Sequence, residues 1–432
     1  MKVIDSKSFL KRLVEVQTCV WVLVVFGIFA YGYLGKIWSE VLIFRVDDGW
    51  CEPGQGIGNH CFGDFGMPYG VGSGNSFYEK KNPAAMNSPL TNLVFVALGK
   101  LNYDFALLTY LAMLLVAALL PFVVGRSSIP FGFRLQTATL FGLISVGSLA
   151  AIDRGNHILI VAALLYGYLI SVERRNWTRA TFLLILISLL KFWGIVLVVL
   201  LVAKSRFRNA LTAVFLTPVL TVILLIPFSG SLSDTTRVML EAVVNRQYGN
   251  VVARYSISIQ GLFRRIVCSL KSGHFCSGSD DPNSWTASVY FSIAILVVLL
   301  LLVLLIINKS SQTPHVWMLF VASIGIVGIP EGPIYQLALT SGAVAAILSL
   351  ENYKIGENWV WTTRALFVSV VVSSTPFSLQ FDRYGKIHLF DDYVFRSYHL
   401  VVPLCWLASF TIASIELLRM RSFKIAREQI DL

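Results

Sequence analysis

Long apolar runs separated by short polar segments make up most of the chain. A helix needs about 20 apolar residues to cross the roughly 30 Å hydrocarbon core of a bilayer. The pattern therefore predicts an all-α polytopic membrane protein that forms a single integral membrane domain over residues 1–432. The apolar runs fall at 16–34, 103–124, 135–152, 158–172, 180–203, 211–227, 290–307, 316–329, 335–350, 365–378 and 400–418.

The run at 180–203 has two interpretations. As one span it would bury Lys191 near the middle of the membrane, which costs at least about 2.5–3.5 kcal/mol. As a hairpin, 180–190 and 195–203 would form two short arms that meet at a turn beside Lys191, in a cavity that other helices cover. The hairpin brings the total to about twelve membrane segments, and both interpretations stay open on sequence alone.

Charge predicts the orientation of the segments. The chain has a formal net charge of +11, but its basic residues sit in short clusters at the ends of apolar runs rather than in one patch, so no nucleic-acid partner is expected. Short cytoplasmic loops carry an excess of Lys and Arg. This rule places both termini in the cytoplasm and makes 39–88 the first extracytoplasmic loop and 229–285 the second large one.

Four of the six cysteines lie in these two predicted outer loops. Cys51 and Cys61 are close in sequence, and so are Cys268 and Cys276. Disulfides persist only in oxidising compartments. We expect each pair to form a disulfide, which agrees with the orientation that the charges predict.

Candidate chemistry concentrates in the first outer loop. The six histidines show no metal-ligand spacing, and no nucleotide-binding motif is present, so we expect neither a metal nor another cofactor. A membrane enzyme of this kind would use a donor already dissolved in the bilayer. Asp64 is the first candidate for a base, and Asp48 and Asp47, just beyond the first span, are the alternatives. The alternative for Asp64 is a loop aspartate that caps a turn or binds Ca²⁺.

Several short motifs resemble those of glycosyltransferase family 87, the polyprenyl-phosphate-mannose-dependent mannosyltransferases of actinobacteria, which belong to the type C glycosyltransferase superfamily. Two departures stand out: Trp193 and Gly194 replace a Tyr-Pro pair, and the Asn-Ser-Pro-Leu sequence at 87–90 lacks an aromatic residue and a proline. The motifs are Asp-Phe-Gly-Met-Pro-Tyr at 64–69, Asn-Ser-Phe-Tyr at 75–78, Gly-Asn-His at 155–157, Lys-Phe-Trp at 191–193, the basic 204–208, 255–261 with Arg264, and 330–335.

The resemblance implies a type C glycosyltransferase-like bundle whose active site faces the extracytoplasmic side of a bacterial, actinobacterial-like cell membrane. An inverting transfer from a lipid phosphate needs a base for the acceptor hydroxyl and a cation for the leaving phosphate. Asp64 would be the base. The donor phosphate would be bound by Lys191, Arg264 and Asn156. The sugar or lipid path would be lined by Tyr69, Tyr78, His157, Trp193 and Glu331.

The expected function is transfer of a sugar, mannose by resemblance, from polyprenyl phosphate to a glycolipid or polysaccharide of the cell envelope. The alternatives are a secondary transporter or flippase of lipid-linked sugars and a non-catalytic subunit of an envelope assembly. Transporters commonly carry repeated halves, and the sequence shows no such repeat. The departures from the family motifs keep the subunit alternative open.

Overall fold

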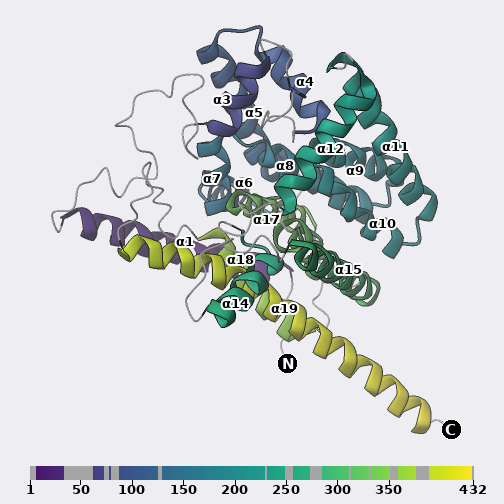
Figure 1. The fold of residues 1–432 in the computed structure, drawn as a ribbon. Helices are drawn as coiled ribbons and strands as arrows, with labels where there is room; N and C mark the ends of the chain where they lie inside the picture. The colour runs from purple at the N-terminus through teal and green to yellow at the C-terminus, as the bar shows by residue number, and fades with distance from the viewer. Residues whose placement is uncertain are drawn as a thin grey trace.

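The protein is all-helical, as its apolar pattern predicts. The computed structural model describes residues 6–33, 62–72, 77–78, 87–124, 129–228, 231–248, 256–272, 285–310, 313–329, 333–350, 359–375 and 389–430, and every regular element in these ranges is a helix (Figure 1). The first twelve are α1 (Ser6–Tyr33), α3 (Gly63–Gly72), α4 (Pro89–Leu98), α5 (Tyr103–Val124), α6 (Phe131–Thr137), η2 (Ala138–Leu143), α7 (Val146–Arg154), α8 (Ile158–Glu173), α9 (Trp177–Leu190), η3 (Phe192–Val198), α10 (Val199–Ala203) and α11 (Phe207–Leu225).

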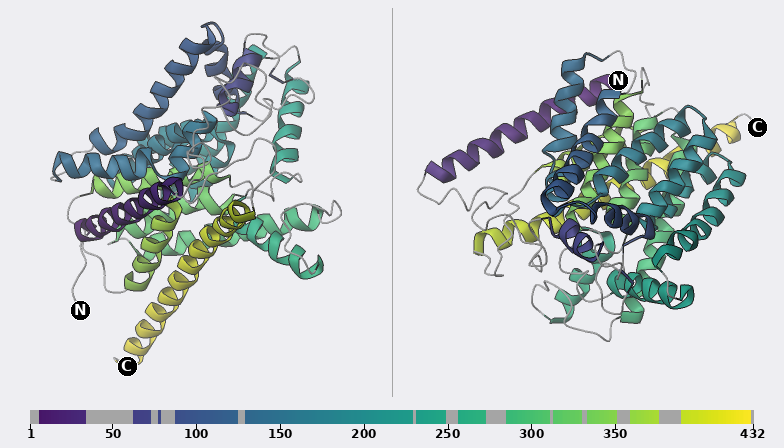
Figure 2. Two further views of the ribbon diagram at one scale, coloured as in Figure 1. Left: turned by 90° about the vertical axis from the view of Figure 1, so that its left-hand side faces the viewer. Right: turned by 90° about the horizontal axis from the view of Figure 1, so that it is seen from above.

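The second part of the chain continues in the same way. Its elements are η4 (Ile226–Phe228), α12 (Leu232–Tyr248), α14 (Ile259–Ser272), α15 (Trp285–Lys309), α16 (Pro314–Ser323), η6 (Ile324–Gly328), η7 (Ile334–Ala338), α17 (Leu339–Leu348), α18 (Val360–Ser374) and α19 (Leu389–Ile430). Of the short elements, η2 and η6 are π-helices, and η3, η4 and η7 are 3₁₀-helices. In Figure 1 and in the left view of Figure 2, α19 projects beyond the other helices toward the C-terminus.

Fewer helices reach spanning length than the sequence predicts. Within the described residues, four are long and apolar enough to cross a membrane, namely Tyr103–Val124, Phe207–Phe228, Ser292–Lys309 and Leu400–Met420. A fifth arises if Phe131–Leu143 and Val146–Arg154, which are bent by 57° relative to each other, form one span. Seven further apolar helical segments have only 10–17 residues. Such short helices are tolerated in a membrane where other protein segments cover them.

The core forms around α16, η6 and α17, all of whose residues are buried. Two glycines allow neighbouring helices to approach this core closely. A Cβ atom on Gly342 of α17 would lie 2.3 Å from the carbonyl oxygen of Ala162 on α8, and one on Gly147 of α7 would lie 2.3 Å from the nitrogen of Ala338. Because neither glycine has a side chain, α8 packs directly on α17, and α7 packs directly on η7.

The chain folds back at Lys191, which is the geometry that the hairpin interpretation requires. Helix α9 ends at Leu190, and Lys191 takes an extended conformation before η3 begins. Past the end of α10, the guanidinium carbon of Arg206 lies 4.5 Å from the centroid of the Trp177 ring, at the start of α9. A Cβ atom on Gly194 would lie 2.6 Å from Cγ2 of Ile187, so the two arms are in contact. Lys191 therefore lies at the tip of the hairpin.

The carboxylate of Glu416 joins α18 and α19, the last two described helices. Glu416 of α19 accepts hydrogen bonds from the backbone nitrogens of Trp361 at 3.0 Å and Thr362 at 3.1 Å, in the first turn of α18. The first four amides of a helix lack partners within the helix, and its dipole favours a negative charge there. Glu416 is 7 % exposed, so these bonds form in a largely dry environment.

We expect Glu416→Gln to destabilise the protein by about 1–2 kcal/mol, because it replaces two charge-assisted hydrogen bonds with at most one neutral bond. The measurement is the midpoint of thermal unfolding in detergent, which should fall by about 1–2 °C. Glu241→Gln, at an exposed position of α12, is the matched control and should leave the midpoint unchanged. Equal midpoints for the two variants would contradict the role of Glu416 as a cap.

Candidate functional site

Asp64 lies in the first turn of α3, where the helix dipole favours a negative charge. The backbone before it makes a sharp turn at Phe62, whose φ is 57°. The nitrogen of Phe62 donates to the carbonyl oxygen of Asp153 at 2.8 Å, and the nitrogens of Phe65 and Gly66 donate to the carbonyl oxygen of Phe62. The first of these bonds attaches the start of α3 to the end of α7, and the other two close the turn at Phe62.

An aromatic cluster holds α3 in place. The Phe65 side chain is fully buried, and its ring centroid lies 5.2–5.8 Å from those of four other aromatic rings, namely Tyr69, Phe95, Tyr103 and Tyr110. Tyr69 also donates its hydroxyl to the carbonyl oxygen of Leu101 at 2.7 Å. Because Phe65 follows Asp64 directly, its packing limits the movement of the carboxylate.

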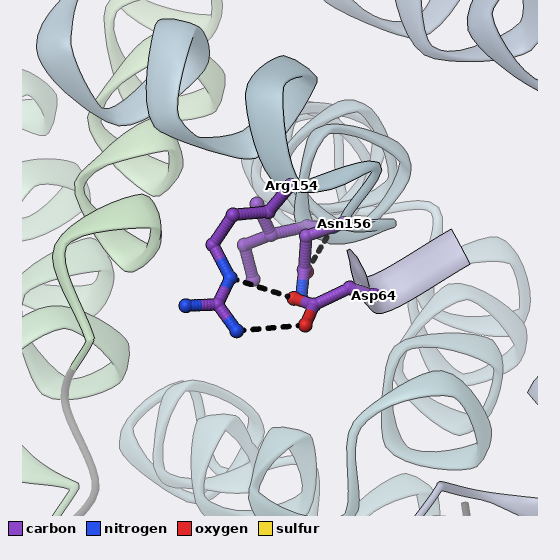
Figure 3. A network of polar contacts seen from close by, with 4 residues as sticks. Asp64, Arg154 and Asn156 are labelled. Carbon is purple, nitrogen blue, oxygen red and sulfur yellow. Dashed lines mark hydrogen bonds and ion pairs between the residues drawn. The ribbon is translucent and has the colours of Figure 1, made fainter. Parts of the chain in front are cut away.

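The Asp64 carboxylate binds two side chains of the α7–α8 turn, which stand on either side of Gly155 (Figure 3). Arg154 donates from Nη2 to Oδ1 at 2.8 Å and from Nε to Oδ2 at 3.2 Å. Asn156 donates from Nδ2 to Oδ2 at 2.6 Å. The side chains of Asp64 and Arg154 are each 22 % exposed. The carboxylate is thus held firmly and still reaches solvent.

Gly155 allows Arg154 and Asn156 to reach the same carboxylate. Its φ is 64°, a left-handed conformation that ends α7 and that residues with a side chain adopt only with strain. A Cβ atom at this position would lie 2.8 Å from Cβ of Phe65. The oxygen of the Asn156 amide accepts from the nitrogen of Ile158 at 3.0 Å, which directs the amide nitrogen toward Asp64.

Two cations lie against one aromatic ring beside this carboxylate. The guanidinium carbon of Arg154 is 5.5 Å from the centroid of the Tyr335 ring, and Nζ of Lys191 is 5.8 Å from the same centroid. Tyr335 belongs to η7, so the ring comes from a third region of the chain. The hairpin tip, the α7–α8 turn and η7 therefore converge next to α3.

His157 connects the hairpin tip to the α7–α8 turn. Its Nε2 lies 3.3 Å from the carbonyl oxygen of Leu190, which can only accept, so Nε2 carries the proton. Burial, and secondly the positive charge of Lys191, lower the pKa of His157 well below its ordinary value. His157 is therefore neutral at pH 7, and Arg154 and Lys191 supply the positive charge.

Of the other predicted site residues, the structure describes the side chains of Tyr78 and Trp193. Tyr78 is buried, its hydroxyl accepts from the amide of Asn92 at 3.0 Å, and burial raises its pKa. The Trp193 ring packs against Gly325 of η6, where a Cβ atom would lie 2.9 Å from the ring. Asp47, Asp48, Cys51, Cys61, Cys276 and Glu331 lie outside the described residues, as do the side chains of Arg264 and Cys268 in α14.

Arg154 is not among the candidate site residues from the sequence, and Tyr335 enters the sequence analysis only as the last residue of the 330–335 motif, without a role. A local ion pair between Arg154 and its neighbour Asp153 is the simplest interpretation of the sequence, but the ion pair in the structure joins Arg154 to Asp64, 90 residues earlier. Asn156, which stays a predicted donor-phosphate ligand, donates its amide to Asp64. Among the described residues no group of three His, Cys, Asp or Glu side chains could hold a metal ion.

Comparison with known proteins connects this geometry to a family. A sequence model described as Glycosyltransferase family 87 matches residues 86–330, more than half of the chain. This match confirms the resemblance that the short motifs indicate. It includes Arg154, Asn156, His157 and Lys191, whereas Asp64 and Tyr335 lie just outside its two ends. No curated protein and no solved structure gives a significant match to the chain.

Proposed function

We propose, from the premise that this chain belongs to glycosyltransferase family 87 and is a glycosyltransferase of the membrane, that its donor is a polyprenyl-phosphate sugar and that the sugar is mannose. The acceptor we propose is a glycolipid or polysaccharide of the bacterial cell envelope. One observation supports this most directly: the partly exposed Asp64 carboxylate lies beside two cations, Arg154 and Lys191, that converge on the Tyr335 ring.

In the reaction we propose, the acceptor hydroxyl attacks the anomeric carbon of the donor sugar. Asp64 takes the proton of that hydroxyl as the new C–O bond forms, and the bond between the anomeric carbon and the phosphate oxygen breaks. The bonding electrons leave with polyprenyl phosphate, whose added negative charge the nearby cations stabilise. A phosphate monoester needs no general acid to leave. Because there is one displacement, the anomeric configuration inverts.

Each side chain of the site has a separate role in this proposal. Asn156 and Arg154 hold the Asp64 carboxylate through three hydrogen bonds. Lys191, at the hairpin tip, is the cation for the donor phosphate. Neutral His157 fixes the tip through Leu190, which keeps Lys191 on the side of Asp64. Orienting a reacting group in this way lowers the entropic part of the barrier.

We place the α3 end of the protein on the extracytoplasmic side. The basic clusters at 126–134, 174–179 and 204–208 support this orientation under the positive-inside rule. Helix α9 begins near the second of these clusters and ends at Leu190, beside the site. The site would then face the compartment in which lipid-linked sugars, rather than nucleotide sugars, serve as donors.

The direct test is a transfer assay with the purified full-length protein, radiolabelled polyprenyl-phosphate mannose and washed cell-envelope membranes as the acceptor. We expect label to enter the glycolipid or polysaccharide fraction, with polyprenyl phosphate as the second product. A nucleoside-diphosphate mannose should support no transfer in membranes depleted of polyprenyl phosphate. Transfer from the nucleotide sugar alone would contradict the proposed donor, and movement of the lipid-linked sugar across liposomes without transfer would favour a flippase.

A further inference from the structure

We infer that Tyr335 is a positioning residue: its ring holds Arg154 beside the base and Lys191 beside the binding site of the leaving phosphate. This inference rests on the proposed function. Arg154 serves the base, and Lys191 serves the leaving phosphate. Tyr335 is the contact they share, at 5.5 Å from the guanidinium carbon and 5.8 Å from Nζ. The face of an aromatic ring carries partial negative charge and attracts cations within about 6 Å of its centroid.

The Tyr335 ring is itself held firmly. It is 5 % exposed and lies in η7, which begins directly after Pro333. The next residues of η7 pack against α7, since a Cβ atom on Gly147 would lie 2.5 Å from the carbonyl carbon of Leu337 and 2.3 Å from the nitrogen of Ala338. Because α7 also ends in Arg154, the ring and the guanidinium group are placed by the same pair of packed segments.

Electrostatics explains why such a residue is useful here. Arg154 and Lys191 repel each other, and each reaches the site from the end of a helix rather than from within one. Lysine side chains tend to extend toward water when they can. A buried ring attracts both cations without carrying a formal negative charge, so it leaves Arg154 paired with Asp64 and adds no anion beside Lys191. A carboxylate in the same place would pair with them and compete with the donor phosphate.

The position of Lys191 should depend on the Tyr335 ring more than the position of Arg154 does. Arg154 is also bound to Asp64 through two hydrogen bonds that do not involve Tyr335. Removal of the ring therefore leaves the Asp64–Arg154 pair in place. We expect the loss to fall on recognition of the donor phosphate, while proton transfer to Asp64 changes much less.

The experiment compares Tyr335→Phe, which keeps the ring, with Tyr335→Leu, which removes it. Tyr335→Phe should keep the donor KM within about threefold of wild type. Tyr335→Leu should raise the donor KM, and the inhibition constant of polyprenyl phosphate, by about tenfold, which is what the loss of the buried cation–π contact to Lys191 implies. Its acceptor KM should be unchanged, and its kcat should stay within about threefold.

Two results would overturn the inference. One is a Tyr335→Phe variant as impaired as Tyr335→Leu, which would assign the role to the hydroxyl group. The other is an unchanged donor KM in Tyr335→Leu. Both variants should elute like the wild type; if Tyr335→Leu fails to fold, Tyr335→Met, whose unbranched and flexible side chain adapts better to the ring cavity, replaces it. Inactivity of the wild type with every polyprenyl-phosphate sugar would contradict the proposed function, and this inference with it.

A double-mutant cycle adds a measurement that a purely structural role would not move. If Tyr335 acts through Lys191, then Tyr335→Leu combined with Lys191→Met should raise the donor KM no further than Lys191→Met alone. Lys191→Arg, which keeps a cation, should retain sensitivity to Tyr335→Leu. Fully additive losses in the cycle would contradict the inference even if both single variants are impaired.

Discussion

Asp64→Asn is expected to lower the kcat of sugar transfer by about 1,000-fold while leaving the donor KM within about threefold of wild type. General-base catalysis contributes about 10²–10⁴ to a rate. The amide has nearly the shape of the carboxylate, but it cannot take the proton from the acceptor hydroxyl. The measurement is steady-state transfer from polyprenyl-phosphate mannose, with protein amount and thermal unfolding checked in parallel.

Asp234→Asn is the matched control for this substitution. Asp234 is an exposed aspartate of α12 that pairs with Arg237 at 3.1 Å, and its replacement should leave kcat unchanged. Full transfer by Asp64→Asn would remove Asp64 from the mechanism. If Asp48→Asn or Asp47→Asn then abolished transfer, the role of base would move to that residue.

Gly155→Ala is expected to lower kcat by about 100-fold without unfolding the protein. The added methyl group would lie 2.8 Å from Cβ of Phe65, and the backbone at φ 64° costs about 1–2 kcal/mol for a residue with a side chain. The strain can be relieved by moving the α7–α8 turn away from α3. Such a movement would separate Arg154 and Asn156 from Asp64, and a shift of about 1 Å in a reacting group can cost about 10²-fold in rate.

Gly70→Ala provides the control for this second substitution. Gly70 lies in the same helix as Asp64, and a Cβ atom there would meet no atom within 4 Å. Alanine is favoured over glycine in a helix by up to about 1 kcal/mol. The control should therefore be fully active and no less stable than the wild type. If Gly155→Ala were equally active, the close approach of the turn to Phe65 would have no role in placing the base.

The site brings together segments from inside and outside the family match. The cations Arg154 and Lys191 lie within the matched residues 86–330, the proposed base Asp64 precedes them, and Tyr335 follows. Gly342 and Gly147 allow the close helix packing that joins these regions. The base and its partners are consequently sensitive to packing changes far from Asp64 in sequence, a feature that the Gly155 substitution tests directly.

The sequence predicted the local properties of the protein better than its long-range contacts. Apolar runs indicated helices throughout, because the side-chain composition of a segment decides whether it can lie among lipids or buried helices. The cost of placing Lys191 at mid-membrane favoured the hairpin, and the chain does fold back there. The short motifs at 64–69, 155–157 and 191–193 indicated the family, which the family match confirms.

The length of the helices departed from the sequence pattern for a physical reason. Several apolar runs are divided or shortened, as where the π-helix η2 precedes a bend of 57° and where η3 replaces a regular helix after Lys191. A run of apolar residues does not show where such a break falls, because the break is stabilised by packing against neighbouring helices. For this reason about twelve expected segments correspond to only four or five helices of spanning length in the described residues.

The sequence by itself determined that this protein is an apolar, all-helical member of its family with Asp64 as the first candidate base. Only the tertiary structure decided which residues surround that carboxylate. Arg154 pairs with Asp64 across 90 residues of sequence, and Tyr335 reaches Arg154 and Lys191 from a third segment. The neighbouring Asp153 is the obvious partner for Arg154 when only the sequence is considered. The actual partner depends on how closely α7, α3 and η7 pack, which the glycines at 147 and 155 set through contacts that no local pattern encodes.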